Sequence, residues 1–171
     1  MTGRATLAAL ISSIALFACA TPRASAESTA AGGADSTTVV TMDRGACHGT
    51  CPVYAVHLAA NGRVTFIGAR FVAPIGVDST RVPSGRVESL RAAFASRKFS
   101  AVPPKIEYGT AACGTYVADL STVTLSVRSA DGEHQVRFDE GCRNHPRMLD
   151  TLASMIDSVT GSARWTRAGK P

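Results

Sequence analysis

Two stretches in which apolar and polar residues alternate, each broken by a tight-turn sequence, constrain the fold of this 171-residue chain more than any other feature. Asn61-Gly62 supplies the turn of the first stretch, and Ala130-Asp131-Gly132 that of the second. The apolar face of the first stretch consists of Tyr54, Val56, Leu58, Val64 and Phe66. The apolar face of the second consists of Val123, Leu125, Val127, Val136 and Phe138. Both stretches predict β-hairpins, and hairpins build antiparallel sheet.

A helical period replaces the alternation after each hairpin. From Ser84, the expected N-cap, to about Lys98, apolar residues recur every three or four positions, and a second such run lies between Pro146 and Gly161. The apolar residues of the two runs are Val87, Leu90, Ala93 and Phe94, then Leu149, Leu152, Ile156 and Val159. The resulting order ββ(β)αββα predicts an α+β two-layer sandwich, with both helices on one face of an antiparallel sheet of two hairpins.

Three further segments complete this expectation. Thr38 to Asp43 is β-branched and strand-like, and Phe71-Val72 can extend a third strand before the helix begins. Phe99 is expected to anchor the exit of the first helix. Residues 100–116 have no periodicity and are predicted to be irregular.

Composition favours one folded domain. With 45% apolar and 18% charged residues, the chain can bury one core but is too short for two ordinary domains. Residues 19–37, rich in Ala, Ser, Thr and Gly, predict a flexible tether before a domain at 38–166 and a tail at 167–171. The net charge of +5 comes from basic residues scattered singly along the chain, which excludes a nucleic-acid interface.

The N-terminal residues have the pattern of an export signal. Arg4 precedes an apolar run of about twelve residues, too short to cross a ~30 Å hydrocarbon core. Leu16-Phe17-Ala18-Cys19 resembles a bacterial lipobox, which implies removal of residues 1–18 and a lipid on the sulfur of Cys19. The alternative is cleavage after Ala24-Ser25-Ala26, which removes residues 1–26. We expect an exported periplasmic protein that a lipid anchors to the outer membrane.

Four cysteines remain after either cleavage, namely Cys47, Cys51, Cys113 and Cys142. In an oxidising compartment they are expected to form two disulfides, with three possible connectivities. The second hairpin favours Cys113 with Cys142, because both lie at its open end, and this leaves Cys47 with Cys51. The alternative is a bridge between the two groups, which would close a longer loop.

The stretch Cys47-His48-Gly49-Thr50-Cys51-Pro52 is the part of the sequence most suggestive of chemistry. Two thiolates at this spacing can hold a soft metal, and the stretch resembles the copper site of exported cytochrome-oxidase assembly chaperones. Cys47 and Cys51 would then be ligands, with His48 or His134 as a third. Thiol redox catalysis is a second possibility, and it requires a lowered thiol pKa. A structural disulfide is the preferred interpretation.

Other catalytic patterns are absent from the sequence. The four histidines are isolated, and neither G-x-S-x-G, a P-loop nor a dinucleotide fingerprint occurs. We therefore expect no enzymatic activity and no cofactor.

The residues from Cys47 to Tyr54, together with Asn61-Gly62, the helix exit at Phe99 and Trp165, form a pattern that resembles the bacterial domain-of-unknown-function family 6438. The C-x-G-x-C-P-x-Y opening is complete, and the resemblance covers about residues 38 to 166. It implies an exported, often lipid-anchored domain without an established activity. The expected function is a non-enzymatic, disulfide-stabilised module that binds an envelope protein or a small molecule. The alternative is a thiol-redox or copper-handling protein.

Overall fold

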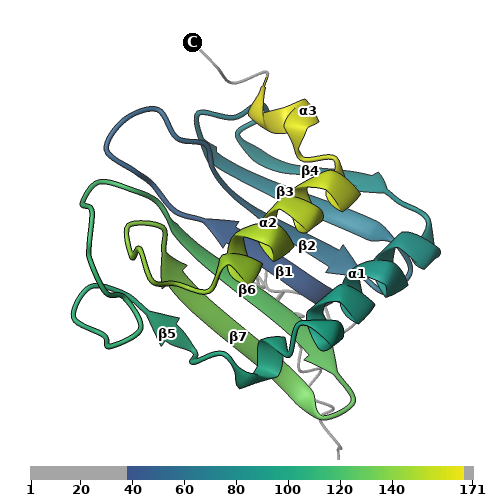
Figure 1. Ribbon diagram of the computed structural model, residues 1–171. Coiled ribbons are helices and arrows are strands. Elements are labelled where there is room, and N and C mark those ends of the chain that lie inside the picture. Colours follow the sequence, from purple (N-terminus) through teal and green to yellow (C-terminus); the bar gives the residue numbers. More distant parts are fainter. Residues whose placement is uncertain (1–37, 168–171) are drawn as a thin grey trace, which may run out of the picture. The chain divides into compact units, whose positions relative to one another are not determined.

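The computed structural model of the protein describes residues 38–167, which form an α+β domain around a seven-stranded sheet (Figure 1). The strands are β1 (Thr38–Arg44), β2 (Val53–Ala59), β3 (Arg63–Arg70), β4 (Gly76–Arg81), β5 (Lys105–Ile106), β6 (Thr122–Ser129) and β7 (Gly132–Asp139). Their order in the sheet is β4-β3-β2-β1-β6-β7-β5. All neighbours are antiparallel except β5, which runs parallel to β7. The predicted α+β class is confirmed, but the sheet is mixed rather than purely antiparallel.

Both predicted helices are present and lie across the same face of the sheet (Figure 1). The helical elements are α1 (Ser84–Ser96), the 3-10 turn η1 (Phe99–Ala101), α2 (Arg147–Thr160) and the short α3 (Ala163–Thr166). Gly161 ends α2 with a left-handed φ of 69°, a conformation in which glycine has no side chain to strain. The prediction of Ser84 as N-cap was wrong, because Pro83 occupies that position and no side chain caps the helix.

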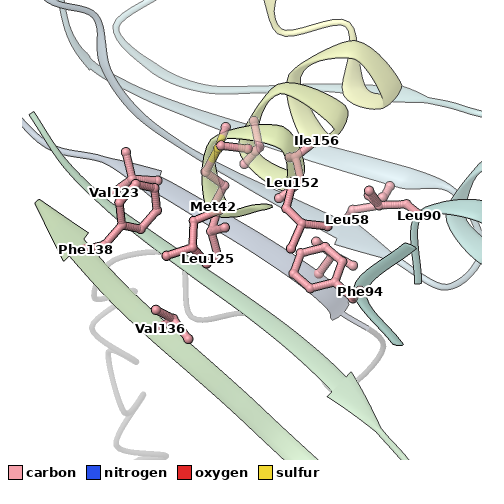
Figure 2. Close-up of a cluster of buried hydrophobic side chains, with 14 of the residues drawn as sticks. Met42, Leu58, Leu90, Phe94, Val123, Leu125, Val136, Phe138, Leu152 and Ile156 are labelled. Atoms are coloured by element: carbon pink, nitrogen blue, oxygen red, sulfur yellow. The ribbon is translucent and has the colours of Figure 1, made fainter. Parts of the chain in front are cut away.

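The hydrophobic core lies between the sheet and the two helices (Figure 2). Alternate residues of the central strands point toward α1 and α2, as the two hairpin patterns predict. The Phe66 ring is stacked between those of Tyr54 and Trp165, with centroid distances of 5.4 and 4.4 Å. Phe99 is fully buried and packs edge-on against Phe94 at 4.8 Å, so it anchors the exit of α1 as expected.

The strands that the sequence pattern missed lie at the two edges of the sheet. β3 ends at Arg70, and Phe71 turns the chain with a positive φ of 53°, so Phe71-Val72 do not extend a strand. The chain returns as β4, whose side chains are mostly exposed and polar and therefore show no apolar alternation. β5 has only two residues, within the segment predicted to be irregular.

The two ends of the sheet differ in what they carry. β1 runs from Thr38 at one end to Arg44 at the other. Arg44 pairs with Val123 at the start of the antiparallel β6, so the β6–β7 turn lies at the Thr38 end. The loops at the Arg44 end, here called the disulfide end, cover residues 45–52, 71–75, 107–121 and 140–146.

Several sequence predictions lie outside the described residues: the signal peptide at 1–18 or 1–26, Cys19, the tether at 19–37 and most of the tail. Within residues 38–167, no helix has the length and apolar character that a membrane span requires.

Candidate functional site

Two disulfides bind the loops of the disulfide end. Cys47 is bonded to Cys51, with 5.8 Å between their Cα atoms, and Cys113 to Cys142, with 4.4 Å. This is the local pairing that the open end of the second hairpin favours. The first bridge closes a ring within one loop, whereas the second joins loop 107–121 to loop 140–146. Neither bridge links the Cys47–Cys51 loop to the other two.

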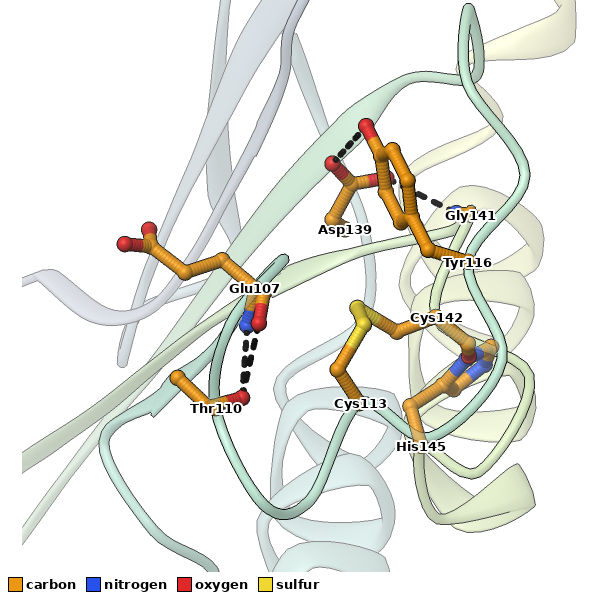
Figure 3. The surroundings of a disulfide bond; sticks show 8 residues. All are labelled: Glu107, Thr110, Cys113, Tyr116, Asp139, Gly141, Cys142 and His145. Atoms are coloured by element: carbon orange, nitrogen blue, oxygen red, sulfur yellow. Dashed lines mark hydrogen bonds between the residues drawn. A yellow bond between two sulfur atoms is a disulfide. The ribbon is translucent and has the colours of Figure 1, made fainter.

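The Cys113–Cys142 bridge is buried, and side-chain hydrogen bonds such as those of Asp139 and Thr110 lie around it (Figure 3). The amide of Val117 donates to the Gly141 carbonyl at 2.9 Å, and the Tyr116 hydroxyl donates to Asp139 at 3.1 Å. The hydrogen bond to Asp139, with burial and the negative charges of Asp139 and Asp119, raises the pKa of Tyr116. A side chain at Gly141 would collide with the Val117 carbonyl and the Tyr116 ring, so this close approach requires glycine.

A cluster of four polar side chains, here called the Arg44 cluster, joins β1, β2, the loop that follows β7, and α2. The Arg44 guanidinium donates to the Tyr54 hydroxyl at 3.1 Å, to Glu140 at 3.2 Å and to Asp157 at 3.1 Å. The Tyr54 hydroxyl in turn donates to Asp157 at 2.7 Å. Burial and the charge of Asp157 raise the pKa of Tyr54, which keeps its hydroxyl protonated and able to donate.

The Arg44 cluster explains the tyrosine of the C-x-G-x-C-P-x-Y motif in structural terms. Its members come from positions up to 113 residues apart, so periodicity and spacing could not bring them together. Burial favours loss of the guanidinium proton, but the interactions with Tyr54, Asp157 and Glu140 outweigh this and raise the pKa of Arg44. Because the one guanidinium bonds both carboxylates and the Tyr54 hydroxyl, the cluster fixes the start of β2 and the end of α2 against β1.

The two disulfide loops touch each other through the backbone. The amide of His48 donates to the carbonyl of Asp119 at 3.0 Å, and the amide of Gly45 donates to Thr122 at 2.8 Å. Asp119 has a positive φ of 71°, a conformation that few residues other than glycine adopt. The loop that contains Cys47–Cys51 therefore supports the chain that leads into β6.

Apolar side chains are exposed on the loop held by Cys113. Tyr108 is 74% exposed, Leu120 40% and Val117 38%. The ring of Tyr108 lies 5.0 Å from that of Tyr116, which is itself fixed by Asp139. We call these four residues the loop surface. They were not among the residues that sequence reasoning selected, because an irregular segment has no periodicity that separates exposed from buried positions.

The residues predicted as possible metal ligands are not brought together. Cys47 and Cys51 are bonded to each other, and His134 lies toward the opposite end of the sheet, with Nε2 3.1 Å from the Val102 carbonyl. Among residues 38–167, no group of three or more His, Cys, Asp or Glu side chains could hold a metal ion. The structure therefore does not assemble a copper site from Cys47, Cys51 and either His48 or His134.

A cavity lies away from the disulfide end, between α1 and the β6–β7 hairpin. This open groove has a volume of about 660 Å³, with Phe94, Phe99 and Val127 among its lining residues. Its two arginines are already paired, Arg91 with Glu88 and Arg128 with Glu133. The groove therefore offers apolar surface, and both of its arginines are already neutralised by a neighbouring glutamate.

Comparison with known families settles the kinship of the chain. The family model described as "Domain of unknown function (DUF6438)" matches residues 38–160. The chain belongs to this family. The matched range runs from the first residue of β1 to the last of α2, so the DUF6438 domain contains both disulfides and the whole Arg44 cluster. Trp165 lies beyond it. No curated protein matches the chain.

Proposed function

We propose that this DUF6438 protein is an exported, lipid-anchored envelope module that binds a protein partner through the loop surface and catalyses no reaction. Two disulfides in one small domain are typical of oxidising compartments, which supports export. The lipobox-like residues before Cys19 support an anchor, in the outer membrane of a cell that has one. In our proposal the domain is a two-layer sandwich whose helices cover one face of the sheet, leaving the loops at the disulfide end for binding.

The observation that carries the binding proposal is the exposure of apolar side chains on a loop that cannot move freely. Aromatic and aliphatic side chains at the centre of a contact supply most of the binding energy in protein interfaces. Tyr108 is the most exposed large apolar residue of the described chain, and the buried bridge at Cys113 fixes the loop that carries it. A preformed loop loses little conformational entropy on binding, so its apolar surface is available for affinity.

Site-specific photocrosslinking in the native envelope tests the binding proposal. We expect a photoreactive residue at Val117 or Leu120 to form a discrete adduct with a protein partner, because both side chains are exposed on the loop surface. The same residue at Asp131, which is also exposed but lies in the β6–β7 turn at the other end, is the matched control and should give none. Adding Tyr108→Ala should abolish the adducts. Three outcomes would contradict the proposal. They are adducts that persist in the Tyr108→Ala variant, equal crosslinking from Asp131, and no adduct from either Val117 or Leu120.

The lipid anchor is tested separately. We expect the native protein to partition into detergent, because the N-terminus of a bacterial lipoprotein carries several buried acyl chains. The variant Cys19→Ala should either stay unprocessed or be released into the aqueous phase, and mass spectrometry of the mature N-terminus reports which. A native N-terminus at Glu27 with no lipid would show that the general signal peptidase processes the chain and that the anchor is absent.

A further inference from the structure

The two disulfides differ sharply in their access to solvent. The cysteines of the second bridge are sealed in the core, with Cys113 1% and Cys142 0% exposed. Cys47 and Cys51 are only half-buried, and the three residues between them are exposed. The space around Gly49 is open, since a side chain added there would meet no atom within 4 Å. A thiolate from solution can therefore approach the sulfurs of the first bridge but not those of the second.

The fold also depends on the two bridges to different degrees. Cys113 and Cys142 are members of the hydrophobic core and join segments 29 residues apart. Cys47 and Cys51 are only four residues apart and lie outside the core cluster. The entropy that a bridge removes from the unfolded chain grows with the logarithm of the number of residues in the loop that it closes. Opening the short ring therefore costs comparatively little stability. We therefore expect the domain to remain folded when the first bridge is opened.

We propose that the Cys47–Cys51 disulfide is a reversible thiol–disulfide exchange site that a dithiol donor opens by reduction. One thiolate of the donor attacks a bridge sulfur, which forms a mixed disulfide and releases the other cysteine as a thiolate. The second donor thiol then attacks the mixed disulfide and frees the remaining cysteine. The donor ends as a disulfide, both cysteines end as thiols, and the two protons of the donor thiols are transferred to them.

Reduction at this site changes the neighbouring loop through a defined contact. The ring closed by Cys47 and Cys51 holds His48 so that its amide reaches the carbonyl of Asp119 at 3.0 Å. Once the ring is open, His48 is free to leave Asp119, which then loses a contact that supports its left-handed backbone. The next residue in the sequence is Leu120, which belongs to the loop surface, so a change in the backbone of Asp119 also moves Leu120. That this change alters partner binding rests on the proposed function; the exchange chemistry does not.

Differential alkylation of the purified folded protein tests the exchange site. The protein is treated with dithiothreitol without denaturant, the freed thiols are labelled, and the positions are read by mass spectrometry. We expect Cys47 and Cys51 to be labelled at least about tenfold faster than Cys113 and Cys142, because exchange rates depend on access to the sulfurs. Circular dichroism should show a folded domain throughout. Equal rates, prior labelling of Cys113, or labelling only after unfolding would overturn the proposal.

Amide NMR provides the second readout. It tests whether the hydrogen bond between His48 and Asp119 depends on the Cys47–Cys51 bridge. On reduction of the first bridge, the His48 amide should lose its protection from hydrogen exchange. The Val117 amide, held to Gly141 beside the intact second bridge, is the internal control and should keep its protection. The double variant Cys47→Ser/Cys51→Ser should show the same loss without reductant and no further change when reductant is added. A His48 amide that stays protected in that variant would show that the bridge does not control the contact.

Discussion

The double replacement Cys113→Ala/Cys142→Ala is expected to lower the free energy of unfolding by about 3 to 4 kcal/mol, the entropic contribution of a bridge between segments 29 residues apart. Alanine is the appropriate replacement because both positions are buried, where a serine hydroxyl would lack an assured hydrogen-bond partner. Urea unfolding of the oxidised proteins measures the difference.

The matched control is Cys47→Ala/Cys51→Ala, which removes the bridge with a separation of four residues. Its expected cost is about 2 kcal/mol, since the chain-entropy contribution grows with loop length. The first double variant should therefore unfold at a clearly lower urea concentration than the second. The reverse order would mean that the exposed loop contributes more to stability than the buried bridge, contrary to the difference in their burial.

The substitution Phe66→Ala is expected to cost about 3 to 5 kcal/mol, the usual range for a buried phenylalanine. Phe66 is 0% exposed and its ring is stacked between those of Tyr54 and Trp165. Alanine leaves a cavity that β2 and β3, fixed by their hydrogen bonds, cannot close. Thermal and urea unfolding measure the loss.

Two controls separate packing from hydrophobicity in this experiment. Phe66→Leu keeps an apolar side chain and should cost much less than Phe66→Ala, since most of the volume is retained. Tyr108→Ala removes an aromatic ring that is 74% exposed and should change stability by less than about 0.5 kcal/mol. A cost for Phe66→Ala no larger than that for Tyr108→Ala would show that the three rings do not form a packed unit.

The parts of the fold that could be predicted are those in which burial repeats at a fixed period. The alternation around Asn61-Gly62 and Asp131-Gly132 predicts β2, β3, β6 and β7, because these strands bury one face against the helices. β4 could not be found in this way. It is an edge strand with exposed polar side chains, and hydrogen bonds to β3 rather than an apolar face hold it in the sheet.

The candidate site was predictable only in its cysteines. The hairpin places Cys113 and Cys142 at one open end, so local topology alone makes their pairing reasonable. The Arg44 cluster depends on the placement of β1 between β2 and β6 and on the packing of α2, which no local pattern encodes. The contact between His48 and Asp119 has the same origin, because it forms between two loops that only the strand order makes neighbours.

The position of β1 has a mechanical consequence. The described chain enters at Thr38, whereas the loop surface lies at the opposite end of the same sheet, and β1 is hydrogen-bonded on both sides, to β2 and to β6. Tension applied through the N-terminal chain while a partner holds the loops acts along the length of β1. Hydrogen bonds between antiparallel strands run perpendicular to the strands, so such a pull shears them together and does not open them one after another. The domain is thus built to resist force along the line that joins its N-terminal entry to its loops.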